Sequence, residues 1–379
     1  MRLSRMFWLS RAKRNLPVAF SDADLIFEWY TRFLSYKGAT RIDRQNENMV
    51  YSNEAKAIEN SRFIHAAPMK LIETLADIDG PFPNAVITIG NFDGVHIGHQ
   101  ALFHEVIERA EAIDGTAVAM TFEPHPIRVL KQNGHPPLIT LYEQKIELMS
   151  AVGLDVLIAL PFTMEFAGWS AERFVKELLV DRIGVKAIVV GQDYTFGRGR
   201  EGNVELLNDY GRQLGFEVHV LDWISTPKNG IGRISSTRVR DLVMEGRMED
   251  AQKLLGRHYQ IRGTVAKGRD RGGRLLGFPT ANIELADELC PKSGIYAVSV
   301  EVRGEKYKGV ANIGYSPTFD DHLFTIEVFI LDFDRTIYDE KIRVNFIQRL
   351  RDEKRFDSVA ELSEQIRKDV ERARGIISI

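Results

Sequence analysis

The sequence contains very little cysteine, because Cys290 is the single one in 379 residues. One cysteine excludes an internal disulfide framework, and it excludes a zinc site built on a C-x-x-C pair. A chain without disulfides is typical of a reducing compartment. We therefore expect a cytoplasmic protein.

The sequence also lacks long apolar runs and a strong charge of either sign. It has no stretch of 18 or more apolar residues, so we expect no membrane-spanning helix. The formal net charge is -3, from 50 Lys and Arg against 53 Asp and Glu. This balance gives no general attraction to nucleic acid or to a membrane surface. We expect neither as a partner, and nothing in the sequence predicts a particular oligomeric state.

Residues 1–68 differ from the rest of the chain. The first 20 residues carry Arg and Lys but no acidic residue, and the stretch to about residue 68 has weak hydrophobic periodicity. A transit peptide or a basic arm has such a composition, whereas a secretory signal needs a longer apolar core. We favour a disordered extension, or a working chain that begins near Met49 or Met69, over a targeting role.

Residues 69–246 show the pattern of an α/β domain. Five short, almost continuously apolar runs are typical of strands buried on both faces, at residues 84–90, 116–122, 155–162, 186–191 and 216–222. Amphipathic helical segments lie between them, and several end in glycine. Strands that alternate with helices predict a doubly wound parallel sheet, in which ligands bind at the carboxyl ends of the strands.

Residues 247–379 have a different pattern. A linking helix is expected at 248–260, followed by alternating segments that are split by glycine-containing turns. Such spacing predicts a small antiparallel barrel or sandwich. The chain then closes with an amphipathic helix at 359–377, in which Leu362, Ile366 and Val370 share one face.

The segment "GNFDGVHIGHQ" follows the first predicted strand and opens a helix. His96 and His99 could bind a metal ion or simply be satisfied in a loop, but no third ligand lies at a helpful spacing. Glycines at this position let the backbone approach a ligand, and the amide groups of a helix N-terminus favour an anion. The spacing matches neither the dinucleotide glycine pattern nor a P-loop. It therefore favours a phosphate site.

A second segment, "ISSTRVR", follows the last strand of the sheet and opens another helix. Ser235 or Ser236 can cap this helix, while Thr237 and Arg238 can face a phosphate chain. Together with H-x-G-H after the first strand, this segment resembles the two-motif arrangement of HIGH-type nucleotidylyltransferases, which have a Rossmann-like fold.

The resemblance extends to the bacterial bifunctional riboflavin kinase/FAD synthetases. "TIGNFDGVHIGHQALF", "TFEPHP", "FAGWSAERFV", "VVGQDYTFGRGREGN" and "ISSTRVR" occur here in that family's order. The resemblance implies an ATP site for adenylylation, in which His96, His99 and Arg238 are catalytic. The site residues that it implies are Gly90, Asn91, Phe92, Asp93, His96, His99, Ser235, Ser236, Thr237 and Arg238, and a flavin and nucleotide loop with Asp193, Phe196 and Arg200.

The second domain carries the motif "GFPTAN", which resembles that of the riboflavin kinases. The resemblance implies that Thr280 and Asn282 meet Mg-ATP, with Thr280 on the Mg²⁺ ion, which prefers oxygen ligands. The glycine- and arginine-rich loop before the motif is suited to polyphosphate, and its glycines at the expected ATP site are Gly268, Gly272 and Gly277.

Two further residues complete the implied kinase site. Glu327 matches the family's general base for the riboflavin hydroxyl, and Arg351 matches an arginine near the flavin, although by itself Arg351 could be an exposed helical charge. Phe329 stands where family members usually carry histidine.

The resemblance covers about residues 69–379 and implies two reactions. Riboflavin would be phosphorylated by ATP to FMN, and FMN would then be adenylylated by ATP to FAD with release of pyrophosphate. Two other interpretations are a single-activity adenylyltransferase with a degenerate barrel and a flavin-binding module without turnover. A tRNA-ligase-like function would require a lysine in the second motif, and "ISSTRVR" has none.

Overall fold

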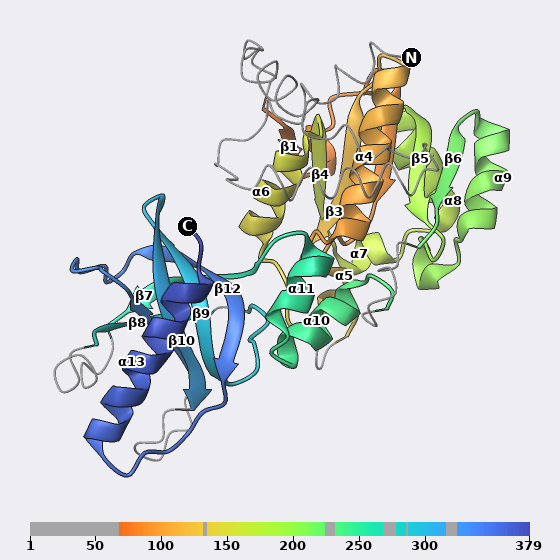
Figure 1. The fold of residues 1–379 in the computed structure, drawn as a ribbon. Helices are drawn as coiled ribbons and strands as arrows, with labels where there is room; N and C mark the ends of the chain where they lie inside the picture. The colour runs from red at the N-terminus through yellow and green to blue at the C-terminus, as the bar shows by residue number, and fades with distance from the viewer. Residues whose placement is uncertain (1–67, 132–134, 224–231, 268–277, 286, 316–323) are drawn as a thin grey trace, which may run out of the picture. The chain divides into compact units, whose positions relative to one another are not determined.

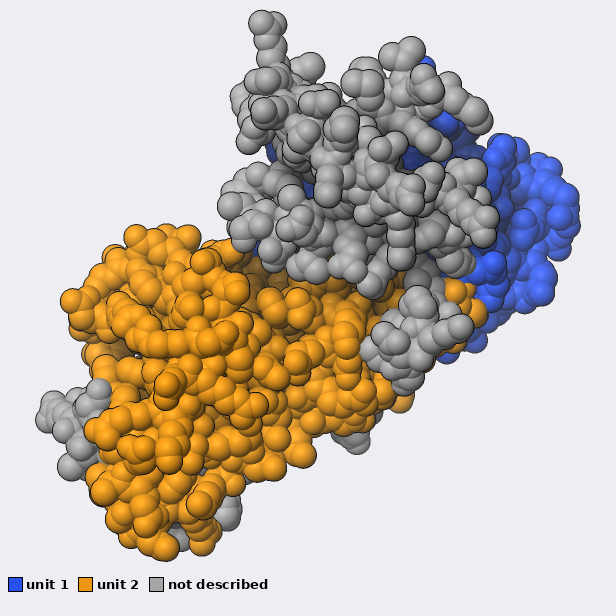
Figure 2. Space-filling model, viewed as in Figure 1, with its two compact units in different colours: residues 1–91, 100–130, 146–222 blue, residues 92–99, 131–145, 223–379 orange. Residues whose placement is uncertain are grey.

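A computed structural model describes residues 68–131, 135–223, 232–267, 278–285, 287–315 and 324–379. The described residues group into two compact units (Figure 2). Unit 1 contains residues up to 91, 100–130 and 146–222, and unit 2 contains residues 92–99, 131–145 and 223–379. The predicted extension at 1–68 lies, apart from its last residue, outside the described residues. The domain boundary between 246 and 247 stays a prediction, since the two units alternate along the chain.

Unit 1 is built on a parallel sheet of six strands, which confirms the predicted fold class. The strand order is β1-β4-β3-β2-β5-β6, and every neighbouring pair is parallel. The five predicted strands are present. The strands are β1 (Lys70–Ile72), β2 (Ala85–Ile89), β3 (Ala117–Glu123), β4 (Val156–Pro161), β5 (Val185–Gly191) and β6 (Glu217–Leu221).

Helices connect these strands (Figure 1). Apolar side chains on them complete the core. β2 is buried along its whole length, as expected for a strand with both faces covered. One of the helical segments expected to end in glycine spans residues 171–184. It begins as α-helix and continues as a π-helix, which ends at Gly184 in a left-handed conformation with φ 71°. The connecting elements are η1 (Leu75–Asp77), α4 (Ile97–Ala112), α5 (Pro126–Leu130), α6 (Tyr142–Val152), α7 (Met164–Ala167), α8 (Ala171–Arg173), η2 (Phe174–Ile183), η3 (Arg198–Arg200) and α9 (Val204–Leu214).

Unit 2 contains a closed antiparallel barrel with the strand order β10-β11-β8-β7-β12-β9. Of the two predicted alternatives, a barrel or a sandwich, the structure therefore shows the barrel. Its strands are β7 (Tyr259–Ala266), β8 (Thr280–Glu284), β9 (Gly294–Val302), β10 (Glu305–Tyr315), β11 (Phe324–Ile330) and β12 (Lys341–Arg351). Two helices, α10 (Ser236–Met244) and α11 (Met248–Leu255), precede the barrel in the chain.

The predicted C-terminal helix is α13 (Val359–Ile376), and it lies across the outside of the barrel (Figure 1). Ala373 and Ile377 pack there against Ile295, Ala297 and other strand side chains. Across the described ranges, no helix is long and apolar enough to cross a membrane.

Candidate functional sites

The strand order of unit 1 places a ligand site at one edge of the sheet. The chain runs outward from β2 to β3 and β4, and then returns to place β5 on the other side of β2. In such sheets a ligand binds outside the carboxyl ends of the two strands where the order reverses. Gly90 and Asn91 follow β2 at this edge, next to Gly191 at the end of β5.

The backbone around Asn91 is held while its side chain stays accessible. The Gly90 amide donates to the Met120 carbonyl at 3.0 Å, and the Thr121 hydroxyl donates to the Asn91 carbonyl at 3.2 Å. Asn91 itself is exposed. The structure therefore places both predicted residues at the carboxyl edge of the sheet, and their role in binding ATP stays a prediction.

The predicted flavin and nucleotide loop follows β5 and divides into buried and exposed residues. Phe196 is 7% exposed, stacks on Tyr194 with ring centroids 5.6 Å apart, and exchanges two backbone hydrogen bonds with Gly202. Asp193 and Arg200 are exposed. Phe196 thus packs the base of the loop, and the two charged side chains lie at its surface.

A cluster of half-buried aromatic rings around Phe166 was missed in the sequence. Phe122, Phe162 and Trp169 lie around Phe166, with ring centroids 5.6, 6.0 and 5.1 Å from it. The Arg173 guanidinium lies 3.9 Å from the Trp169 ring centroid. Phe122 is the penultimate residue of β3, and Phe162 directly follows β4. Aromatic residues at the carboxyl ends of two predicted strands were the available signal.

His96 and His99 stack on each other in unit 2. Their ring centroids are 3.6 Å apart with an interplanar angle of 19°. Gly98 permits this approach, because a Cβ there would lie 3.2 Å from the His96 ring. The His99 amide donates to Nδ1 of His96 at 3.3 Å, so the neutral His96 ring carries its proton on Nε2.

Both histidines are held in the neutral state. Burial lowers the pKa of His96 to about 3, and the charges of Arg257 and Arg240 act in the same direction. Burial, followed by His96, Lys145 and Arg257, also lowers the pKa of His99 well below its ordinary value. The pair therefore presents neutral N–H donors at the start of α4, where the helix dipole also favours an anion.

Asp93 is buried and bound by donors of the protein, whereas a residue that binds ATP is expected to face the ligand. Its side chain is 4% exposed, and its carboxylate accepts hydrogen bonds from the Ile139 amide at 3.0 Å and the Thr140 amide at 3.1 Å. It also pairs with Arg240 on α10. Asp93 is thus directed into the protein, and its predicted role in binding ATP stays a prediction.

The "ISSTRVR" segment begins α10 as predicted. Ser235 is the N-cap, and its hydroxyl accepts a hydrogen bond from the Arg238 amide at 3.2 Å. The Ser236 hydroxyl donates to the Asp93 carbonyl at 2.9 Å. It thus joins this helix to residues 92–99, which contain both histidines and are called the histidine loop below. Thr237 is exposed, and the half-buried Arg238 lies 3.9 Å from Glu245.

Phe92, another predicted ATP-site residue, is a packing residue. It is 2% exposed and meets His99 edge-on, with ring centroids 5.3 Å apart. Its backbone adopts φ 48°, as part of a strained turn before the histidines.

Unit 2 also brings the predicted kinase residues onto one face of the barrel. Glu327 on β11 lies directly opposite Asn282 on β8, and Thr280 lies opposite Phe329. Side chains directly opposite on antiparallel strands have Cβ atoms about 4.5–5.5 Å apart. The alternate residues Ala281, Ile283, Ile326 and Val328 point into the barrel core. Thr280, Asn282 and Glu327 therefore share the outer face.

On the other side of Glu327 lies Asn312 of β10, which the sequence did not single out. Its Oδ1 atom is buried and has no hydrogen-bond partner among the described residues. Burial raises the pKa of Glu327 above its ordinary value. The carboxylate thus lies between two asparagines. Only the strand register reveals the second one, and the sequence alone does not fix that register.

Arg351 ends β12 and is not on a helix. Asn312 and Arg351 both lie opposite Ile295 of β9, so Arg351 belongs to the same cross-strand row as Glu327. Its guanidinium binds Asp369 of α13 through Nε and Nη2, the latter at 2.7 Å. Along this row, from β11 through β10 and β9 to β12, Arg351 lies three strands away from Glu327. The predicted glycines Gly268, Gly272 and Gly277 lie outside the described residues.

Two family models match the chain, and they match different parts of it. The model described as FAD synthetase covers residues 81–238, and the model described as riboflavin kinase covers residues 255–377. The first contains the histidine loop and the start of α10. The second contains the Thr280, Asn282 and Glu327 face.

Whole-length relatives combine both parts. The bifunctional riboflavin kinase/FMN adenylyltransferase of Listeria monocytogenes is 41% identical over 78% of this chain and 93% of its own length. The protein of that name from Escherichia coli is 38% identical over 82% of this chain and 99% of its own length.

A solved structure shares the arrangement of the elements. The structure of a macrolide-efflux protein from Streptococcus pneumoniae has a TM-score of 0.72 and 35% identity, and it covers 81% of this chain and 98% of that chain.

Proposed function

The chain belongs to the bifunctional riboflavin kinase/FMN adenylyltransferases, and we propose which of its residues serve the two reactions. It phosphorylates riboflavin with ATP to FMN, and it adenylylates FMN with ATP to FAD and pyrophosphate. From the Streptococcus pneumoniae structure we take only the shared fold, since its name refers to another activity.

We assign the kinase reaction to the outer face of the barrel. Glu327 accepts the proton of the riboflavin 5′-hydroxyl as its oxygen attacks the γ-phosphorus of ATP, and ADP leaves. The arrangement that supports this is the position of Glu327 directly opposite Asn282, next to Thr280 on the same face. Burial moves the pKa of Glu327 upward, which makes its carboxylate a stronger base.

The oxygen atoms of this face fit a Mg²⁺ ion. Thr280 and Asn282 offer a hydroxyl and an amide oxygen, the hard donors that Mg²⁺ prefers, and phosphates and waters complete such sites. The bound ion would neutralise charge on the phosphates. The contribution of the chain is to position ATP through Thr280 and Asn282, while Arg351 lies in the same row and is assigned to the flavin.

We assign adenylyl transfer to the histidine loop and the start of α10, which both belong to unit 2. The phosphate of FMN is already an anionic nucleophile, so no protein base is needed when it attacks the α-phosphorus of ATP. Asn91, His96, His99 and Arg238 then stabilise negative charge on the departing pyrophosphate. The stacked neutral histidines, which are donors at a helix N-terminus, support this assignment most directly.

The aromatic cluster around Phe166 suits the flavin ring of FMN. Flat aromatic rings favour stacked or edge-on neighbours, and Phe122, Phe162 and Trp169 surround Phe166 in tilted or edge-on geometry. Asp193 and Arg200, which are exposed in the loop after β5, are assigned to polar parts of the same ligands.

Separate substitutions test the two assignments. We expect Glu327→Ala to reduce FMN formation about 10²- to 10⁴-fold, which is the usual contribution of general acid–base catalysis. FAD synthesis from supplied FMN should continue in this variant. The double variant His96→Ala with His99→Ala should lose FAD synthesis from supplied FMN, while its formation of FMN from riboflavin should continue. Products are separated by chromatography after incubation with riboflavin or FMN and Mg-ATP.

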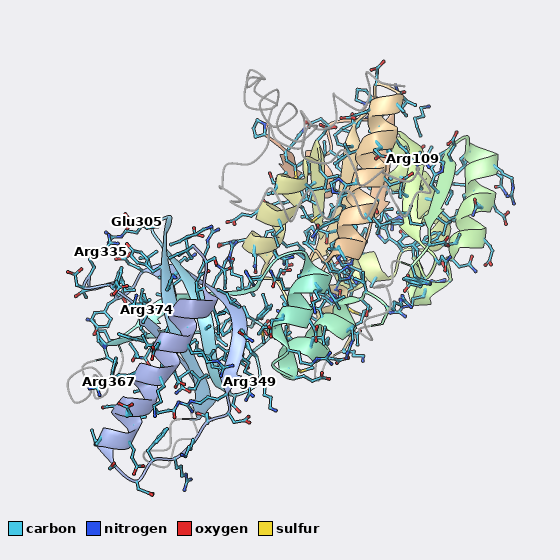
Figure 3. The ribbon with its side chains drawn as sticks, in the orientation of Figure 1. Arg109, Glu305, Arg335, Arg349, Arg367 and Arg374 are labelled. Carbon is cyan, nitrogen blue, oxygen red and sulfur yellow. The ribbon has the colours of Figure 1, made fainter. Side chains whose placement is uncertain are left out.

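Glu305→Gln serves as the matched control for the kinase site. Glu305 is a barrel-strand glutamate paired with Arg335 at 2.6 Å (Figure 3), away from the row of Glu327. Both activities should persist in this variant. If either test variant remains folded but loses both reactions equally, the assignment of two separate sites is wrong.

A further inference from the structure

Arg257 connects the start of the barrel to the histidine loop. It lies between Gly256, which caps α11, and Tyr259, which begins β7. Its Nη2 donates to the Gly94 carbonyl at 2.8 Å, and its Nη1 lies 3.4 Å from the Val95 carbonyl. These two carbonyls directly precede His96. The guanidinium therefore holds the backbone from which the first histidine projects.

The backbone that Arg257 holds is strained. Val95 has φ 41°, a left-handed conformation that a β-branched side chain rarely adopts. Gly94 has φ 86°, and a Cβ at this position would lie 3.1 Å from two atoms of Ile139. For the β-branched Val95 this conformation is unfavourable, and it persists only where its surroundings enforce it. Two hydrogen bonds from a charged donor are a means of enforcing it.

The charge of Arg257 also acts on both histidines. It is among the groups that lower the pKa of His96 and of His99, after burial. Burial lowers the pKa of Arg257 itself to about 10, so the guanidinium stays protonated at neutral pH. Arg257 thus holds the loop and helps to keep its histidines neutral.

We propose that Arg257 is a positioning residue for adenylyl transfer, although it lies in the part of the chain matched by the riboflavin kinase model, residues 255–377. This inference rests on the proposed function of the histidine loop. Arg257 acts through the carbonyls of Gly94 and Val95 and contacts no substrate. The adenylyltransferase half is then incomplete without the first residues of the kinase half.

The test uses the full chain with Arg257→Met and Arg257→Lys. A displacement of about 1 Å can reduce a rate about 10²-fold, so kcat for FAD synthesis from FMN should fall 10- to 100-fold in Arg257→Met. KM for FMN should change much less, because the flavin ring is assigned to unit 1. Arg257→Lys, which keeps the charge but not the paired donors, should give an intermediate kcat.

Riboflavin phosphorylation reports on folding in the same variants. The barrel and Arg257 belong to one compact unit, so a general loss of structure would reduce both reactions. We expect the kinase rate to stay within twofold of the wild type. Arg247→Met is the matched control, since Arg247 lies at the other end of α11, where it pairs with Asp250 at 2.7 Å, and its loss should leave both reactions unchanged.

Three outcomes would overturn the inference. Wild-type kcat for FAD synthesis in Arg257→Met would show that the loop does not need this side chain. A parallel loss of both reactions would show a purely structural role, and so would an equal effect of Arg247→Met. A wild-type chain that makes no FAD from FMN would instead contradict the proposed function itself.

Discussion

Asp93 and Arg240 form an ion pair in which both side chains are almost completely buried, with 4% and 11% of their surfaces exposed. The pair joins the histidine loop to α10, and it supports the two segments that are expected to hold ATP. Arg240 also donates through Nε to the Pro137 carbonyl at 3.0 Å, and Asp93 also accepts from two backbone amides. All of these contacts of Asp93 and Arg240 lie within unit 2.

Removal of Arg240 should be strongly destabilising. Arg240→Met leaves the Asp93 carboxylate buried without its counter-charge, and breaking a buried pair in this way costs about 3–5 kcal/mol. We expect a loss of this size in the free energy of unfolding, measured by urea denaturation followed by circular dichroism. FAD synthesis should also fall, because the loop and α10 lose their connection.

Arg374→Met is the control for this loss. Arg374 pairs with Asp332 on the barrel surface, where the two side chains are 45% and 72% exposed. Exposed ion pairs contribute little to stability. An equal loss of stability in the two variants would contradict the importance of the buried pair.

Glu327 should reduce the stability of the barrel at neutral pH. Burial raises its pKa in the folded state, so the folded protein favours the protonated carboxyl. The protonated carboxyl therefore stabilises the folded state. This stabilisation is complete below the pKa that Glu327 has in the unfolded chain, and it is lost as the pH rises through its pKa in the folded protein. Above the folded pKa the buried carboxylate is charged, and Glu327→Gln should there raise the melting temperature while strongly reducing FMN formation.

The pH dependence distinguishes this effect from a change in packing. The gain in melting temperature should shrink as the pH is lowered through the folded pKa of Glu327, because the wild-type carboxyl then becomes protonated. Glu305→Gln should change stability in the opposite direction at pH 7, because hydrogen bonds from Tyr307 and Arg335 lower the pKa of Glu305. A constant gain for Glu327→Gln at every pH would contradict the electrostatic explanation.

Much of the fold could be predicted from local patterns in the sequence. Five strands of the parallel sheet are continuous apolar runs, and the C-terminal helix has a regular apolar stripe. β1 was missed because its three residues, Lys70–Ile72, are too few to show a period. β12 was missed although Ile342, Val344 and Phe346 alternate with polar residues. Register shifts after Phe346 and after Arg349 break this alternation near Arg351, which was considered as a helical charge.

The sites depend on contacts that no local pattern contains. The motifs identified His96, Glu327 and their neighbours in the chain. Asp93, however, finds its partners at Ile139, Thr140 and Arg240, which lie 46, 47 and 147 positions away. Asn312 reaches Glu327 only through the register of β10 and β11. Such pairings are determined by the packing of the whole unit.

Phe329, which stands where related kinases usually carry histidine, supports the nucleotide motif of the kinase. It lies opposite Thr280 and meets Phe278 edge-on, with ring centroids 5.3 Å apart. Phe278 precedes Thr280 in the "GFPTAN" segment. An aromatic pair of this kind contributes about 0.5–1.5 kcal/mol, and here it fixes the segment that is assigned to ATP.

We therefore expect Phe329→Ala to raise KM for ATP in riboflavin phosphorylation by about 2- to 10-fold, as follows from the energy of one aromatic pair. Phe329→His should keep KM close to the wild-type value, because the imidazole ring preserves the edge-on contact. Phe333→Ala is the control, since Phe333 packs against Tyr307 and not against the nucleotide segment. Steady-state kinetics with ATP as the varied substrate measure all three variants. An unchanged KM in Phe329→Ala would show that Phe278 and Thr280 hold their positions without this ring, whereas a rise in KM confined to that variant would establish the aromatic pair as part of the ATP site.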